Sequence, residues 1–169
     1  MSLVDATIAE AASLTGDLCG RLFVGASSTP GTYLLPLSLV RLRTEYPLAE
    51  VIVESGNSQA IERRLYEHQI DLGLMGRPPT RSDLQSEVIV ADDIVFVTSP
   101  RHRLAGKQQV SAKALMEEAL LVREYGSATR SVLAAALIEL GLRLKPLMEM
   151  ENTEAIKRSV MAGLGRVVW

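Results

Sequence analysis

The sequence has one cysteine, two histidines and no long apolar run, and each shortage excludes a class of protein. Cys19 alone cannot form an intrachain disulfide, which fits a reducing compartment. His68 and His102 lie in no spacing typical of metal ligands, so we expect no metal site. No stretch approaches the ~20 apolar residues that a membrane span needs. We therefore expect a cytoplasmic protein that neither spans a membrane nor depends on disulfides.

The sequence also lacks a large net charge of either sign. The formal net charge is -2, so no global basic field would recruit nucleic acid. Residues 1–16 lack the basic start and long apolar block of a secretory signal. Hydrophobic residues make up 47% of the 169 residues, which suits a globular chain with one large or two small lobes.

What the sequence does contain is a regular alternation of strand and helix patterns. The expected strands of its first half are 20–26, 51–53 and 70–76, and the expected helices are 31–45 and one that opens at Gly56. A spacing of about 30 residues between strands suits right-handed parallel units, so we predict an open parallel sheet of the α/β class. The charged residues from Glu62 to Glu67 are expected to face solvent.

A second alternation follows the first. The expected strands are 88–90, 94–97, 119–122 and 145–150, and the expected helices are 111–117, 127–140 and 153–162. We place the boundary between two lobes near 92–100. The expected division is 1–18 for a linker remnant, 19–92 for the first lobe and 93–169 for the second lobe.

Hydroxyl and amide side chains recur where an expected strand runs into a helix. They are Ser27, Ser28 and Thr29 at the first junction, Ser127 and Thr129 with nearby Arg123 and Arg130 at the second, and Asn152 at the third. A helix N-terminus has unpaired N–H groups and about half a positive charge, so it attracts anions. The same side chains also cap helices. Each junction is therefore either a simple cap, as for Ser28 or Thr29, or part of one ligand site at the strand ends.

Six segments carry a family pattern in a fixed order and spacing. They are GRLFVGASST at 20–29, LLPLSLVRLRTEYP at 34–47, VIVESGNSQAIERRLYEHQIDLGLMG at 51–76, VFVTSPRHRLAG at 95–106, VREYGSATRSVL at 122–133 and NTEAIKRSVMAGLG at 152–165. Together they resemble the effector-binding domain of LysR-type transcriptional regulators. Segments 70–79 and 123–130 look most like the subgroup that controls carbon-fixation operons.

The resemblance implies two Rossmann-like lobes with a ligand cleft, similar to type 2 periplasmic binding proteins. It implies a small-molecule effector, a dimer or tetramer of the regulator, and no cofactor. The residues it would place on the effector are Ser27, Ser28, Thr29, Gly76, Thr98, Ser127, Thr129 and Asn152. The helix starts favour a small anion, a carboxylate or a phosphorylated metabolite, and Arg123 joins the candidate set as a nearby cation.

The chain departs from the family pattern at both ends. Such regulators carry an N-terminal winged helix-turn-helix, so we expect contact with DNA only through that missing domain. The family continues past the segment that here ends at Trp169, so we expect the C-terminal return to the first lobe to be missing. Arg166 stands where an apolar residue is usual. The apolar face of helix 31–45 leads us to expect self-association.

Two other functions compete with this interpretation. A solute-binding protein of a transporter shares the fold, and the lack of a secretory signal argues against it. An enzyme has less support, because residues 27–29 lack a Gly-x-Ser-x-Gly elbow and no histidine lies near a candidate nucleophile. Glu62, Glu124 and Glu154 are expected in solvated or capping roles. We therefore expect no catalytic residue.

Overall fold

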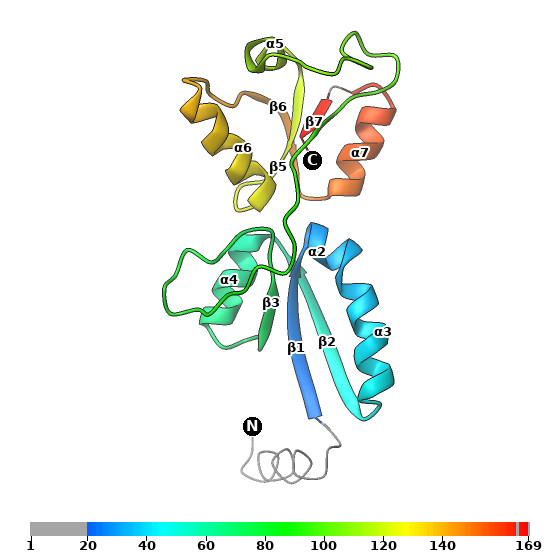
Figure 1. Ribbon diagram of the computed structural model, residues 1–169, viewed down its shortest axis with the longest axis vertical. Helices are drawn as coiled ribbons and strands as arrows, with labels where there is room; N and C mark the ends of the chain where they lie inside the picture. The colour runs from blue at the N-terminus through cyan, green and yellow to red at the C-terminus, as the bar shows by residue number, and fades with distance from the viewer. Residues whose placement is uncertain (1–19, 165, 169) are drawn as a thin grey trace. The chain divides into compact units, whose positions relative to one another are not determined.

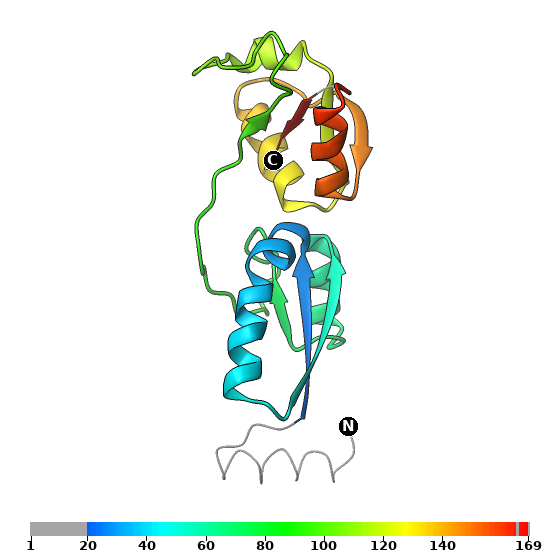
Figure 2. The same cartoon turned by 90° about the vertical axis from the view of Figure 1, so that its right-hand side faces the viewer.

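The computed structural model describes residues 20–164 and 166–168, and the chain divides into two compact units (Figures 1 and 2). The first unit takes the described residues up to Met75 together with Pro79–Leu84. The second takes Gly76–Pro78 and the described residues from Gln85 onward. The linker expected over residues 1–18 lies outside the described residues.

The first unit is built on the predicted parallel sheet. Its strands are β1 (Gly20–Ser27), β2 (Ala49–Gly56) and β3 (Leu72–Leu74), in the order β2-β1-β3. β1 is parallel to both neighbours, and Ser27 lies opposite Gly56. Because successive side chains alternate between faces, Val24 and Ala26 share one face and pack against Leu35 in the core.

The opposite face of this sheet includes Gly25 and Gly73 on neighbouring strands, and a helix packs closely on it. That helix is α4 (Ser58–Tyr66). A Cβ atom on Gly25 would lie 2.4 Å from Ile70 Cδ1 and 3.1 Å from Ile61 Cδ1, and Ile61 is fully buried. Glycine at this position therefore allows the helix to approach the strand.

The helix expected over 31–45 is two helices, and the first begins earlier than predicted. They are α2 (Ser28–Tyr33) and α3 (Leu35–Glu45). Pro30 fits in the first turn of α2, where N–H groups have no partner within the helix. Pro36 is the second residue of α3, and its missing N–H group and its ring interrupt a continuous helix. Leu34 separates the two helices.

The prediction that Glu62 faces solvent is wrong. Glu62 is only 5% exposed, and its Oε1 accepts hydrogen bonds from Thr80 N (2.6 Å), Thr80 Oγ1 (2.6 Å) and Arg81 N (3.1 Å). The Arg81 guanidinium lies 3.4 Å from the centre of the Tyr66 ring. The loop Pro79–Leu84 thus folds back over α4, a long-range contact that the helical charge pattern does not contain.

The second unit has a mixed sheet in the order β4-β7-β5-β6. Its strands are β4 (Phe96–Val97), β5 (Leu120–Arg123), β6 (Pro146–Met150) and β7 (Arg166–Val168), and its helices are α5 (Ala112–Met116), α6 (Ala128–Glu139) and α7 (Thr153–Met161). β5 is parallel to β6 and β7, and β4 is antiparallel to β7. All four residues of β5 are buried. Leu121 packs with Ile156 and Val160 of α7 in one core cluster.

The strand expected over 88–90 is absent, and only Phe96–Val97 of the run 94–97 is a strand. Val88, Ile89 and Val90 are 76%, 74% and 58% exposed. β-Branched residues form a strand where neighbouring backbone and packing accept them, and no described strand pairs with this segment. Within the described residues, no helix is long and apolar enough to cross a membrane.

Candidate functional site

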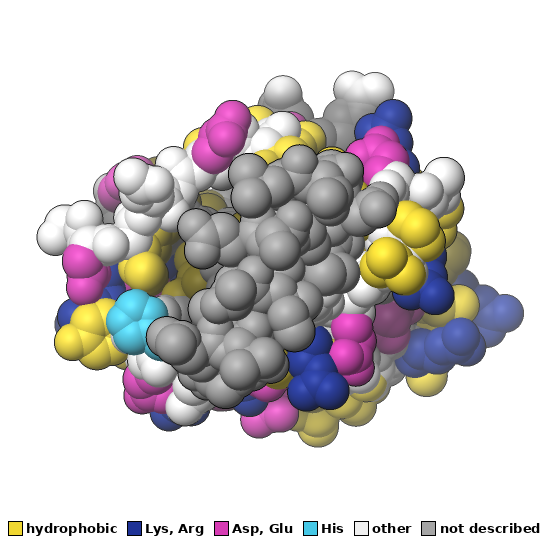
Figure 3. Space-filling model, turned by 90° about the horizontal axis from the view of Figure 1, so that it is seen from below, with side chains coloured by type: hydrophobic (Ala, Val, Ile, Leu, Met, Phe, Trp, Pro, Cys, Tyr) yellow, Lys and Arg dark blue, Asp and Glu magenta, His cyan; other side chains and the backbone are white. Residues whose placement is uncertain are grey.

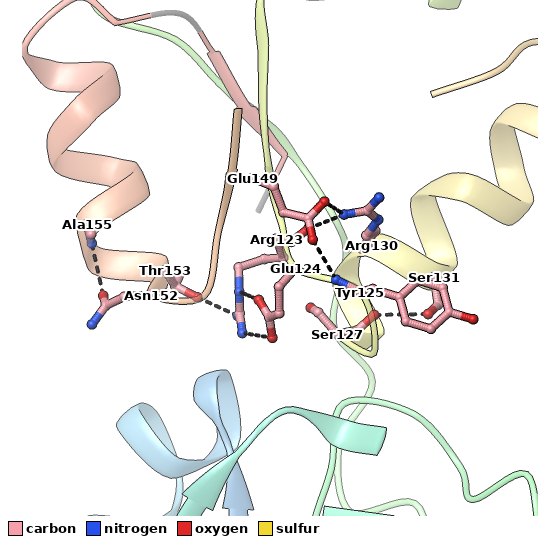
Figure 4. A network of polar contacts seen from close by, with 10 residues as sticks. All are labelled: Arg123, Glu124, Tyr125, Ser127, Arg130, Ser131, Glu149, Asn152, Thr153 and Ala155. Atoms are coloured by element: carbon pink, nitrogen blue, oxygen red, sulfur yellow. Dashed lines mark hydrogen bonds and ion pairs between the residues drawn. The ribbon is translucent and has the colours of Figure 1, made fainter. Parts of the chain in front are cut away.

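The best-defined polar cluster of the second unit lies where β5 and β6 end (Figure 4). The two strands are parallel, with Arg123 opposite Met150, so their carboxyl ends meet at the same edge. Ser127 is the N-cap of α6 and Asn152 is the N-cap of α7. Two helix starts, each with unpaired backbone N–H groups, are therefore brought to this edge.

Arg123 is buried, and its guanidinium is engaged within the unit. Its Nε and Nη2 donate to the two carboxylate oxygens of Glu124, at 2.8 Å and 3.0 Å. Its Nη1 donates to Thr153 Oγ1 at 2.7 Å. Figure 4 shows these bonds joining the end of β5 to the first residue of α7. Arg123 thus fixes two neighbouring elements, and Glu124 balances its charge.

A second ion pair holds the loop between β5 and α6. Arg130 Nη1 donates to the carbonyl of Arg123 (3.0 Å) and pairs with Glu149 Oε2. Glu149 Oε1 accepts from Tyr125 N at 3.1 Å. The Arg130 hydrogen bond and then the Tyr125 N–H group hold the pKa of Glu149 below its ordinary value. Gly126 has a φ of +91°, the left-handed region that glycine adopts at no steric cost.

The predicted hydroxyl and amide residues of this edge differ in what they do. The Asn152 side chain accepts from Ala155 N at 3.0 Å, so it caps α7. Ser127 is 3% exposed and its side chain makes no capping bond, although its carbonyl accepts from Ser131 Oγ at 3.0 Å. Thr129 lies in the first turn of α6 and is half-buried.

The first unit has a similar edge, at the carboxyl ends of β1 and β2. Ser27 is the N-cap of α2, 5% exposed and without a side-chain capping bond. Ser28 and Thr29 are the first two residues of that helix, so the prediction that one of them is the cap is wrong. The cap moves to Ser27 because α2 begins three residues before the predicted helix.

The junction of β2 and α4 is not among the predicted site residues. Asn57 caps α4 through its Oδ1, which accepts from Ala60 N at 3.0 Å. Ser58 follows, 1% exposed, with no hydrogen-bond partner for its Oγ among the described residues. The register of Ser27 with Gly56 puts this junction beside the end of β1. The signal was present, since Gly56-Asn57-Ser58 is again a strand end followed by polar residues and a helix.

Of the last two predicted residues, Gly76 lies beside the start of α6, whereas Thr98 does not border β5. A Cβ atom on Gly76 would lie 3.0 Å from the Cβ of Ala128, the first residue of α6. Thr98 directly follows β4, which β7 separates from β5. Over residues 20–164 and 166–168, no group of three or more His, Cys, Asp or Glu side chains is arranged to hold a metal ion.

Comparisons with known proteins extend over nearly the whole chain. Residues 15–168 match the family model of the LysR substrate binding domain. The chain is 36% identical over 154 residues to the HTH-type transcriptional regulator CbbR of Sinorhizobium medicae, covering 90% of this chain and 49% of that protein. It is 34% identical over 140 residues to the HTH-type transcriptional activator CmpR of Synechocystis, covering 83% and 46%. The chain thus spans about half the length of the curated relatives it matches.

Solved structures agree with the sequence matches. The regulatory domain of Synechocystis CcmR, solved in complex with 2-PG, superposes with a TM-score of 0.81 at 30% identity, covering 88% of this chain and 71% of that one. The predicted fold class is confirmed, and so is the resemblance to the carbon-fixation regulators among which CbbR and CmpR fall. Nothing found supports the transporter alternative. The chain belongs to the LysR substrate-binding domain family.

Proposed function

We propose that this chain senses a small anionic metabolite and that its bound state controls DNA binding by a longer regulator of which it forms part. The observation that carries the proposal is the family match over residues 15–168, together with a 30% identical neighbour described in complex with 2-PG. DNA recognition belongs to a part of the regulator outside this match. The domain works by binding and has no catalytic residue, no metal and no cofactor, and it acts in the cytoplasm.

The ligand is held mainly by neutral donors. The α6 start supplies backbone N–H groups, with Ser127 and Thr129 as hydroxyl donors, and the α7 start supplies Asn152 and its neighbours. Both nearby arginines are paired with glutamates, so the helix starts carry the attraction for an anion. The further candidate contacts are Ser27, Ser28, Thr29, Gly76 and Thr98. Arg123 contributes by holding Thr153 in place.

The regulator forms a homodimer or tetramer, with α3 in the interface. Leu37 and Val40 on α3 are 72% and 66% exposed, an apolar pair that water solvates poorly. Figure 3 shows hydrophobic side chains at the visible surface in separate groups among charged ones. Light scattering on Leu37→Glu/Val40→Glu tests the interface, and an unchanged oligomer would exclude α3 from it.

The ligand proposal is tested by calorimetry with 2-PG on Thr129→Ala. A hydrogen bond to a charged group contributes roughly 1.5–3 kcal/mol, so its loss should weaken binding about 10- to 150-fold. Thr44→Ala is the matched control, because the Thr44 hydroxyl donates to the Val40 carbonyl within its own helix, α3 (2.9 Å). Equal affinity of Thr129→Ala and the parent would reduce Thr129 to a structural residue of α6.

A further inference from the structure

The candidate site of the second unit contains an arginine and a glutamate that are both almost completely buried. Arg123 is 5% exposed and Glu124 is 8% exposed. Their two parallel bonds, at 2.8 Å and 3.0 Å, use the fork of N–H groups with which arginine clasps carboxylates and phosphates in general. A carboxylate of the chain itself therefore takes the pair of donors that would otherwise suit an anionic ligand.

The surrounding contacts keep this arrangement in place. Arg123 Nη1 donates to Thr153 Oγ1, and Glu124 is tied by its backbone, since its carbonyl accepts from Ser127 N at 3.2 Å. The pair therefore lies between the start of α6 and the start of α7, the two elements proposed to hold the ligand. Two charges buried here cost desolvation, which only good geometry and full pairing offset.

The second arginine of this edge is balanced in the same way. Arg130 pairs with Glu149 and also donates to the carbonyl of Arg123. The two arginines and their two glutamate partners therefore carry a formal charge that sums to zero. An anion site that needed arginine charge for affinity would leave at least one guanidinium without a carboxylate partner.

We propose that Glu124 is a specificity-determining residue, a built-in counter-ion that prevents Arg123 from attracting anions to the site. The inference rests on the proposed function, because it concerns the same site. With Glu124 in place, binding depends on the fit of a ligand to the hydroxyl and N–H donors. Without the negative charge of Glu124, Arg123 would add a positive charge near the site, and the site would bind simple anions that it does not bind in the parent.

The test is Glu124→Gln, with anion binding measured by thermal shift and calorimetry at constant ionic strength. The probes are inorganic phosphate and 2-PG. The expected result is at least about 5-fold tighter phosphate binding, because one added charge about 4 Å away contributes about 1 kcal/mol even in a water-like dielectric. Glu139→Gln is the matched control. It removes the same charge from the last residue of α6, at the end of the helix away from Ser127, and is expected to leave phosphate binding as in the parent.

A double variant shows whether Arg123 is the source of the gain. Arg123→Gln/Glu124→Gln removes both charges and should lose the tighter phosphate binding of Glu124→Gln. If Glu124→Gln is unfolded in phosphate-free buffer, phosphate should restore its fold, since an anion that binds only the folded state stabilises it. Failure of phosphate to do so, while the double variant folds, would overturn the inference.

The outcomes separate this inference from the proposed function. Unchanged or weaker phosphate binding by a folded Glu124→Gln overturns the inference, even if the parent binds 2-PG. A gain in Glu124→Gln supports it, even if the parent responds to neither probe, a result that would instead count against the proposed class of ligand.

Discussion

The two units place similar polar residues at the ends of parallel strands but stabilise them differently. At the end of β1, Ser27 leads into α2 without a side-chain capping bond, and the ion pair of the neighbouring strand β2, Arg64–Glu54, is only partly buried. At the end of β5, Arg123 and Arg130 each pair with a glutamate and donate to a second element. The first unit packs α4 closely against Gly25 of β1, whereas the second edge contains a buried charge pair, Arg123–Glu124. The same local pattern in a sequence can thus be stabilised by different physical means.

The largest expected loss of stability follows the removal of a buried charged partner. Arg123→Ala leaves Glu124 buried without its cation, and we expect a loss of roughly 3–5 kcal/mol in the free energy of unfolding. Arg21→Ala in the first unit is the control, since the Arg21–Glu50 pair is 67% and 59% exposed in its side chains and is worth about 0–1 kcal/mol. Urea unfolding measures both. Equal losses in the two variants would mean that the second edge does not depend on its charge pair.

The stability of the first unit should depend instead on the volume of the side chain at position 25. Gly25→Ala puts a methyl group 2.4 Å from Ile70 Cδ1, and we expect a loss of roughly 1–3 kcal/mol in the free energy of unfolding, the usual cost of overpacking. Gly56→Ala is the milder control, because its nearest neighbour, Ala60 Cβ, is 3.3 Å away. A Gly25→Ala variant as stable as the parent would show that the Ile70 side chain or α4 can move away from β1.

Two helix starts within the second unit allow a capping residue to be compared with a residue that makes no capping bond. Asn152→Ala removes the bond from Ala155 N and should cost about 1 kcal/mol of stability, the typical loss for a capping side chain. Ser127→Ala should cost less, because Ser127 makes no side-chain capping bond. Thermal unfolding of the two variants decides this order, and the reverse order would assign the structural role to Ser127.

The smallest expected difference is in pH dependence. The pKa of Glu149 is held below its ordinary value of 4.5, first by the Arg130 hydrogen bond. A lowered pKa in the folded state gives stability that is present above the ordinary pKa and is lost as the pH falls through the folded value. Glu149→Gln should therefore lose less unfolding free energy than the parent as the pH falls below about 4.5, as measured by urea unfolding. An equal loss in the variant and the parent would show that the pair is too exposed to matter.

The periodic features of the fold could be predicted from the sequence, while the long-range contacts could not. The parallel first sheet, the α6 and α7 positions and the capping role of Asn152 follow from local spacing. The burial of Glu62 does not, because it depends on a loop that folds back 18 residues later. The missing strand at 88–90 shows the same limit, since strand formation needs a partner.

The candidate site was partly predictable for a related reason. Parallel strands bring their carboxyl ends together, so the polar junctions could be expected to share an edge. The pairing of Arg123 with Glu124 could not, because consecutive residues on a strand point to opposite faces and Glu124 turns back only because β5 has ended. Which of these residues contact a ligand stays a prediction.

The central claim is that a small anion binds at the polar helix starts of this chain. Its most direct test is an NMR titration of backbone amides with 2-PG. We expect saturable shifts at the amides of Ser127, Ala128 and Thr129 and at those of Ser28 and Thr29, with residues 88–90 unaffected. Shifts confined to other regions, or no shifts at saturating 2-PG, would contradict it.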